Sequence, residues 1–383
     1  MVAPARARAW ARRAAMIRVH MSSLRTSARL RALALALSIT CAIGQLYSPP
    51  ASACYWDNDT LAMEKRRFPE AIELISGRFL RHSGEYYRWR VEDRRGRLAA
   101  TGDAAPDEDA RQAWTDDLAV ALDKLGRHDE AIALLERELA RAPDRYETRA
   151  NLGTFLIHAG RLEQGLVHIR RAIEINPDAH FGREVIQQRL VEYVLEVRRA
   201  RPTGLPLDVR DIKPALQIIR DPKTHESRAL EPRMPWITSP LFGTRGFAAY
   251  AESKGHTRDE ALKGVLGMMR FGQHTSPILL EALGDVLIWD HQVKRDAKRL
   301  AARAYLKASY SVEDPWAAMW YRARATLTLV GHRGVSLAQL EQRFELEQKR
   351  GELYAARIAE DEASWREAGE DLDAKFKRKY MRR

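Results

Sequence analysis

Two pairs of helix-ending residues recur at a single interval in this chain. Gly126 and Gly160 lie 34 residues apart, and Pro143 and Pro177 are separated by the same 34 residues. A fixed interval of this size is the signature of a repeated helix–turn–helix unit. Such a unit cannot bury its apolar face alone, so it stacks on copies of itself and presents a concave surface. The interval therefore predicts a helical chain with a binding surface, but it does not identify the ligand.

Equivalent side chains recur elsewhere in the two units, as large apolar residues around small ones at the expected helix crossings. The equivalent pairs are Leu118 and Leu152, Ala119 and Gly153, Leu122 and Leu156, Ala131 and Gly165, and Leu135 and Ile169. Gly126 and Gly160 let the chain leave a helix without a Cβ penalty, which predicts a left-handed conformation there. Pro143 and Pro177 stop the second helix of each unit.

Over about Arg111 to Asp178, this register resembles the tetratricopeptide repeat, and an ordinary pair of helical hairpins is the alternative. The chain departs from the consensus at the aromatic position near the start, where Trp114 comes one place early and Arg149 stands in the second unit. The resemblance implies an all-α, TPR-type helical-hairpin solenoid. At least about three units are usually needed for a stable stack, so we expect further helices on both sides.

The pattern divides the whole chain into six segments. They are a signal peptide at 1–53, an N-terminal helical segment at 54–110, TPR-like repeats at 111–200, a Pro-rich irregular connector at 201–256, divergent helical repeats at 257–336, and a charged C-terminal helix with a basic tail at 337–383. Upstream helices are expected from Phe68 and from Phe79. The helix expected from Phe181 is either a divergent repeat or a capping helix.

The second helical region has its own start and stop signals. Thr257 and Glu260 form a capping-box pattern, and Ser276 before Pro277 marks a second start. Pro315 is expected to end the helix that precedes it. The glycine-rich run from Gly264 is better explained by close helix packing than by a cofactor. Further on, glycines at 351 and 369 are expected to interrupt or soften a long exposed helix.

The N-terminus has the composition of an export signal. Residues 1–53 hold eight arginines and no acids, and an apolar run is followed by Ala51-Ser52-Ala53 before Cys54. This pattern predicts cleavage before Cys54 and delivery to the periplasm or cell envelope. An uncleaved anchor helix and a lipoprotein modified on Cys54 are the alternatives. The opening at Cys54 also resembles a group of uncharacterised exported bacterial repeat proteins, which implies no activity.

Removal of this segment changes the charge argument. The full chain has a formal net charge of +12, and loss of the eight arginines leaves +4, which does not favour nucleic-acid binding. The remaining local basic cluster is the tail: Lys375, Lys377, Arg378, Lys379, Arg382 and Arg383. Such a tail is either a solvated terminus or a patch for anionic lipid or wall polymer. A membrane contact is therefore expected only through this tail or through a lipid on Cys54.

No catalytic, cofactor or metal motif is evident in the sequence. A phosphate loop, a nucleophile elbow and a cysteine pair are all lacking. One region does gather candidate metal ligands, namely His256, His274, His291, Asp285 and Asp290, but their spacing fits no ligand motif. The alternative to a binding protein is an enzyme or enzyme subunit with a site within 201–290, where Trp236 could form a substrate lip.

The resemblance assigns six positions to the concave groove. They are Asp116, Val120, Asp123, Ala150, Thr154 and Ile157. Because Asp116 and Asp123 would repel an anion, the expected partner is a neutral or basic segment of another envelope protein. The alternative is that both carboxylates are solvated on the convex side. The leading hypothesis is thus a non-enzymatic scaffold with a peptide-binding groove.

Overall fold

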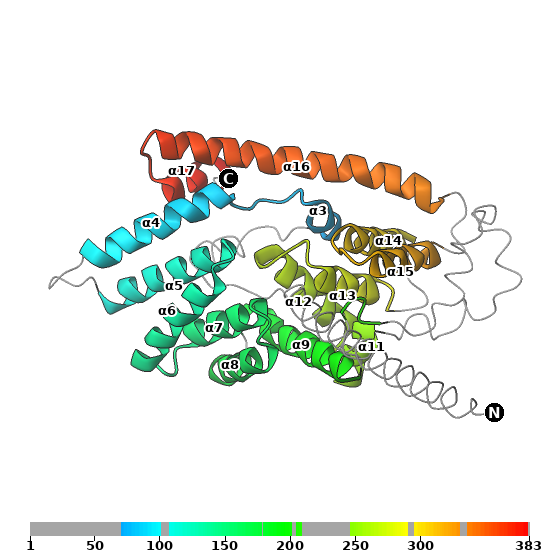
Figure 1. Cartoon of the computed structure of the whole chain (residues 1–383), viewed down its shortest axis with the longest axis horizontal. Coiled ribbons are helices and arrows are strands. Elements are labelled where there is room, and N and C mark those ends of the chain that lie inside the picture. Colours follow the sequence, from blue (N-terminus) through cyan, green and yellow to red (C-terminus); the bar gives the residue numbers. More distant parts are fainter. Residues whose placement is uncertain are drawn as a thin grey trace, which may run out of the picture. The chain divides into compact units, whose positions relative to one another are not determined.

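A computed structural model describes residues 70–100, 107–177, 179–200, 204–208, 246–289, 295–329 and 335–381 (Figure 1). Within those ranges every regular element is a helix and none is a strand, which confirms the all-α prediction. The predicted signal peptide, Cys54, Asp290, His291, Trp236 and most of the Pro-rich connector lie outside the described residues. None of the helices in the described ranges has the length and apolar character needed to span a membrane.

Two stacked helical hairpins occupy the predicted repeat segment. Their helices are α5 (Glu108–Lys124), α6 (His128–Arg141), α7 (Tyr146–His158) and α8 (Leu162–Ile175). The turn within each hairpin contains one glycine with a positive φ angle, +74° at Gly126 and +79° at Gly160. Both are therefore left-handed, as the sequence predicted, and each is followed by the second helix of its unit.

A pair of glycines sets the crossing of α7 and α8. A Cβ atom on Gly165 would lie 2.7 Å from the carbonyl oxygen of Gly153, and one on Gly153 would lie 2.9 Å from that of Gly165. Side-chain carbons do not tolerate such distances, so only glycine permits this approach. The small residues that the repeat register placed at this crossing thus have a direct steric cause.

The repeat period continues into α9 (Arg183–Ala200), which follows a short 3-10 turn, η1 (Ala179–Gly182). Ile186 and Leu190 stand 34 residues after the equivalent leucines of α7, and both are buried. Besides α8, the helices that pack on α9 are α11 (Gly246–Ser253) and α12 (Arg258–Phe271). A Cβ on Gly264 would lie 2.4 Å from the Cβ of Ile186. Close packing therefore explains the glycine-rich run, as predicted.

The second helical region comprises α12, α13 (Pro277–Leu287), α14 (Arg295–Tyr310) and α15 (Pro315–Thr328). The predicted capping box of Thr257 and Glu260 is present. The role expected for Pro315 was wrong, because this residue begins α15 and α14 has already ended. Proline suits the first helical position because its missing N–H has no intrahelical partner there, and the Asp314 side chain accepts a hydrogen bond from Trp316 N.

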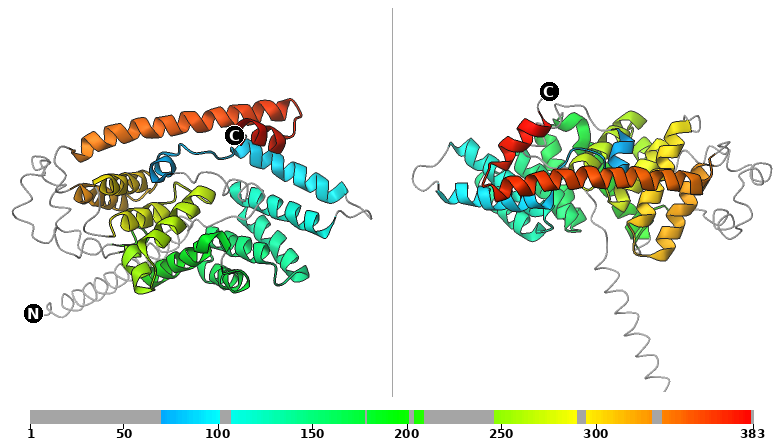
Figure 2. Two further views of the ribbon diagram at one scale, coloured as in Figure 1. Left: turned by 180° about the vertical axis from the view of Figure 1, so that it is seen from behind. Right: turned by 90° about the horizontal axis from the view of Figure 1, so that it is seen from above.

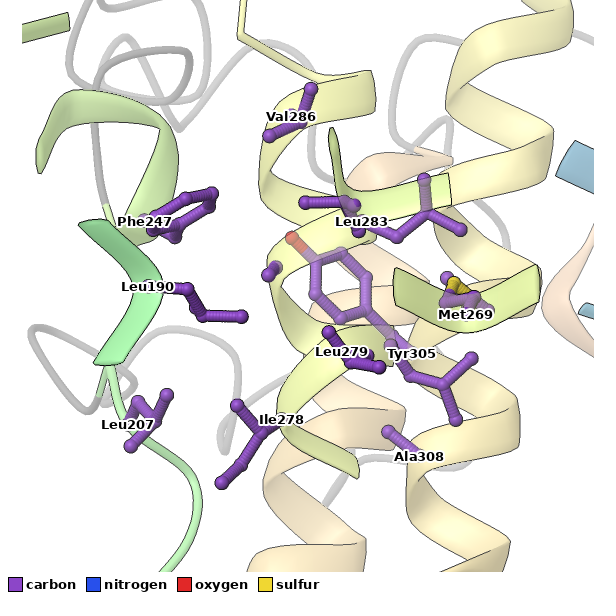
Figure 3. Packing of buried hydrophobic residues seen from close by; sticks show 14 of the residues in the cluster. Leu190, Leu207, Phe247, Met269, Ile278, Leu279, Leu283, Val286, Tyr305 and Ala308 are labelled. Carbon is purple, nitrogen blue, oxygen red and sulfur yellow. The ribbon is translucent and has the colours of Figure 1, made fainter. Parts of the chain in front are cut away.

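These helices share a continuous apolar core with α9. Figure 3 shows its side chains turned toward one another from α9, α11, α12, α13 and α14: Leu190, Phe247, Met269, Leu279 and Tyr305. The core is therefore built from segments on both sides of the connector. The fifth helix of the repeat series, α9, and the second helical region thus form one packed unit.

Near the N-terminal end, α3 (Ala71–Ser76) is short and α4 (Gly84–Ala100) is long. The helix expected from Phe79 begins only at Gly84, because Gly77, at a φ of +78°, has ended α3 and the chain between is not helical. In this region α4 packs on α5. It takes the place that the second helix of a preceding unit would occupy.

At the C-terminal end, α16 (Leu337–Glu367) contacts α14, α3 and α4, and α17 (Leu372–Tyr380) follows it (Figures 1 and 2). Of the two effects expected at Gly351, an interruption was wrong, because α16 runs through this residue. A Cβ there would lie 2.1 Å from the carbonyl oxygen of Ser76, so this glycine allows α3 to approach. Gly369, with a φ of +67°, does end the helix.

Candidate partner-binding site

The six residues predicted to line an open groove are all buried, with at most 5% of any of them exposed: Asp116, Val120, Asp123, Ala150, Thr154 and Ile157. The expectation that they face a solvent-filled groove was therefore wrong. Their side chains contact other parts of the same chain, and each acidic one has a basic partner.

Parts of α9 and α12 contact the repeat pair. Lys124 Nζ donates hydrogen bonds of 2.6 and 3.0 Å to the carbonyl oxygens of Phe271 and Gly272, at the end of α12. The ring of Phe271 lies in the apolar cluster of the first hairpin. Thr154 accepts a 3.3 Å hydrogen bond from Gln187 on α9. Of the six positions that the register assigns to the groove, Thr154 thus contacts α9 of the same chain.

Asp116 is paired across the two hairpins. Its carboxylate lies 2.6 Å from Arg145 Nη2, in the segment that leads into α7. Burial raises the pKa of Asp116 to about 7, although the Arg145 guanidinium opposes that rise. A buried, paired carboxylate does not repel an approaching anion as an exposed one would. The argument for a neutral or basic partner therefore loses its basis at this residue.

Asp123 lies between two imidazoles. It contacts His128 Nδ1 at 2.7 Å through Oδ1 and His158 Nδ1 at 2.8 Å through Oδ2. These three residues come from the end of α5, the start of α6 and the end of α7. Although burial opposes ionisation, the two histidines hold the pKa of Asp123 far below its usual value. The hydrogen bond that His128 makes to the Asp123 carboxylate raises the pKa of His128.

The second helical region contains a buried cluster of carboxylates around Arg324. Asp285 Oδ1 accepts hydrogen bonds of 2.7 Å from both Arg324 Nη2 and the Tyr305 hydroxyl. Glu281 accepts one of 2.7 Å from the Tyr321 hydroxyl. Burial raises the pKa of Glu281 and of Asp285. Nothing in the sequence spacing identified Arg324, which lies about forty residues beyond its partners.

The same carboxylates bind backbone on both sides of the connector. Glu281 accepts hydrogen bonds from the N–H groups of Leu207 and Asp208, at 3.0 and 2.9 Å. Asp285 accepts one from Phe247 N at 3.0 Å. These carboxylate oxygens therefore bind backbone N–H groups from segments before and after the connector. This arrangement favours a structural role for the cluster over catalysis.

The described histidines of the region 201–290 do not gather into a site. His256 Nε2 accepts a 3.3 Å hydrogen bond from Arg189. His274 packs edge-on against Phe79 at 5.0 Å, and burial lowers its pKa to about 3. Neither contacts Asp285. The convergent pocket that would support the enzyme alternative is not formed by these side chains.

The C-terminal helices are joined to α4 through buried polar groups. Glu362 on α16 contacts His82 Nδ1 at 2.6 Å and accepts a 2.8 Å hydrogen bond from Ser83 N. Asp373 on α17 contacts Arg90 at 3.1 Å. Only one face of α16 is buried by these contacts, so the prediction of a wholly exposed helix was wrong.

The opposite face of α16 combines exposed leucines with basic side chains. Leu346 and Leu353 are 61% and 63% exposed and stand two helical turns apart. Four exposed cations share their side of the helix: Arg343, Lys349, Arg350 and Arg357. We call these six residues the basic ridge. The sequence does contain a signal for this ridge, which the groove hypothesis did not use. The two leucines are seven residues apart, and basic residues lie three or four residues from them.

Comparison with known families agrees with the repeat geometry. Residues 117–183 match the tetratricopeptide repeat. The chain therefore contains tetratricopeptide repeats in this segment. Searches of curated proteins and of solved structures gave no significant match. In a tetratricopeptide-repeat protein, stacked hairpins commonly serve as a protein-interaction module, and the matched segment covers both hairpins from α5 to the start of α9.

Proposed function

We propose that this tetratricopeptide-repeat protein is an exported, non-enzymatic scaffold that binds an envelope partner through the basic ridge of α16. The match of residues 117–183 to the tetratricopeptide repeat carries the proposal of a scaffold. Stacked repeats form an extended, rigid frame whose usual role is to present a binding surface. The six positions assigned to the groove of this frame are buried, which favours a partner site on another face.

The ridge suits an amphipathic helix with acidic flanks. Leucines spaced by seven residues, such as Leu346 and Leu353, pack against the apolar stripe of a second helix. Lys349 and Arg350 lie between them along the axis, where they attract carboxylates and repel basic segments. The basic ridge therefore favours an acidic partner. A neutral or basic partner was inferred from Asp116 and Asp123, but both residues are buried.

Export is supported by the sequence of residues 1–53 alone. We expect intact-mass spectrometry of the protein recovered from its native host to show a chain beginning at Cys54. A diacylglycerol adduct on Cys54 would establish the lipoprotein alternative. A chain that retains residues before Ala51 would contradict cleavage and would favour the anchor helix.

Partner capture from envelope extract tests the ridge. The double variant Leu346→Gln with Leu353→Gln should lose the captured protein, because the apolar contact is removed from an already exposed position. Lys349→Glu with Arg350→Glu should slow capture most strongly at low salt. The matched control is Val167→Gln on α8, since Val167 is 61% exposed and distant in sequence from the ridge.

Two further measurements separate the alternative occupants. Light scattering of the purified chain detects a second copy of itself on the ridge. Co-sedimentation with vesicles containing phosphatidylglycerol detects an anionic membrane. If either signal is seen with the parent chain and is abolished by the leucine variant, the ridge binds a second copy or an anionic membrane instead of a protein partner. Capture that is equal in the ridge variants and the control would overturn the ridge as the binding face.

A further inference from the structure

We propose that Asp123, His128 and His158 form a transition-metal site, with Zn²⁺ as the best-fitting ion, that links the two hairpins of the repeat pair. The residues supply one carboxylate oxygen and two imidazole nitrogens. One ligand atom from each lies within 4.8 Å of those of the other two. This site is independent of the proposed partner surface on α16.

Local structure fixes each of the three side chains. Asp123 and His128 flank the first hairpin turn, where Gly126 N donates to the Asp123 carbonyl at 2.9 Å. His158 ends α7 just before the equivalent turn of the second hairpin, where Gly160 N donates to Ile157 O at 3.0 Å. The stacking of the repeats therefore brings the ligands together, although 30 residues separate the two histidines. Ligands on helix ends are held more precisely than ligands on long loops.

The distances need only a small adjustment to hold an ion. Zinc binds imidazole nitrogen and carboxylate oxygen at about 2.0–2.2 Å, so two ligand atoms on one tetrahedral ion lie about 3.3 Å apart. The contacts from Asp123 to His128 and to His158 are 2.7 and 2.8 Å. A tetrahedral ion would need each of these two contacts to open by about half an ångström, and the two imidazole ligand atoms, which lie within 4.8 Å of each other, to stand about 3.3 Å apart. The metal would then take the place of the shared protons.

The donor set selects the class of ion. Calcium and magnesium prefer sites made entirely of oxygen, whereas two imidazoles and a carboxylate suit zinc and its neighbours. The side chains of Asp123 and His158 are almost fully buried, and that of His128 is 25% exposed. The partly exposed ring gives the ion a route from solvent, and three protein ligands leave one coordination position for water.

The alternative is a carboxylate that simply hydrogen-bonds two imidazoles. Both arrangements stabilise the junction of α5, α6 and α7, so loss of stability on substitution does not separate them. Only a metal site makes the thermal midpoint depend on zinc. Only a metal site gives bound Co²⁺ the visible absorption of a tetrahedral complex with nitrogen and oxygen ligands.

The test uses the untagged full chain with Cys41 and Cys54 changed to serine, stripped of metal and titrated with Zn²⁺ and Co²⁺. We expect one equivalent of Zn²⁺ per chain and a raised thermal midpoint. His128→Ala should weaken binding by more than about 100-fold, since even loss of an outer hydrogen-bond partner costs about 10–100-fold. His158→Ala should do the same, and if it fails to fold, the partly exposed His128 still provides the test.

His256→Ala is the matched control, because His256 is also partly buried and lies 3.9 Å from a carboxylate, that of Glu260, without a second imidazole. It should bind zinc as the parent chain does. The proposal is overturned if the parent chain shows no stoichiometric binding. It is equally overturned if His128→Ala binds with unchanged affinity, or if His256→Ala loses binding to the same extent.

Discussion

Close packing between helices has different causes in the repeat pair and in the second helical region. In the repeat pair, Gly153 and Gly165 bring two backbones together, and short turns with left-handed glycines set the register. In the second region, the ring of Tyr305 packs directly on Gly284. A Cβ atom on Gly284 would lie only 2.5 Å from that ring. That region also depends on buried charge around Arg324. In the repeat pair, short regular turns thus fix how neighbouring helices align. In the second region, hydrogen bonds and ion pairs between residues far apart in the sequence fix the alignment.

The largest expected effect comes from breaking that charge cluster. Arg324→Met should cost about 3–5 kcal/mol in unfolding free energy, because it leaves the buried Asp285 and Glu281 without their cation. Arg322→Met is the matched control: its side chain is 40% exposed and pairs with Glu341, so it should cost less than about 1 kcal/mol. Urea unfolding measures both. Equal costs would mean that the second region does not depend on its buried charge.

The next effect is a pH dependence in the repeat pair. Because the pKa of Asp116 is raised to about 7, the folded chain keeps a proton between about pH 4 and 7 that the unfolded chain has released. Unfolding free energy should therefore fall as pH rises through this interval, by on the order of 2–4 kcal/mol for this group. Asp116→Asn should remove that part of the slope. An unchanged slope in urea unfolding would show that Arg145 keeps Asp116 ionised throughout.

A smaller effect tests the close backbone approach. Gly165→Ala and Gly284→Ala should each cost about 1–3 kcal/mol through overpacking, in the first and second region respectively. Gly96→Ala on α4 is the control, since a Cβ there meets nothing within 4 Å, and it should stabilise by about 0.5–1 kcal/mol. Thermal or urea unfolding of the three variants is sufficient. A tolerated Gly165→Ala would mean that α7 and α8 can separate at little cost.

The smallest effect concerns the turn itself. Gly160→Val should cost about 1–2 kcal/mol, because a side chain with a Cβ is strained at a positive φ angle. Gly160→Asn should cost less, since asparagine tolerates this conformation best among the other residues. A Cβ at this position would meet nothing within 4 Å, so the difference isolates backbone strain from crowding. Equal unfolding midpoints for the two variants would argue against a strained turn.

The helices and their turns could be predicted because their causes are local. Gly160 and the capping box of Thr257 are read from neighbouring residues. The orientation of Asp116 could not be predicted, because its environment depends on Arg145 in the next hairpin. Likewise, the repeat register assigned positions to the groove, but no local pattern showed that they would be buried. The prediction of a neutral or basic partner, which depended on those positions, lost its basis for this reason.

The contacts between α16 and the α3–α4 segment have a consequence for how the chain is made. His82 meets Glu362 across 280 residues, and Arg90 meets Asp373 across 283. A ribosome therefore releases the repeats and the second helical region before the partners of these groups exist. Until α16 and α17 emerge, two buried positions on the early segment remain solvated, and closing so long a loop is slow. A chain cut short before Glu362 would thus be synthesised almost whole and yet stay open to proteases at its beginning.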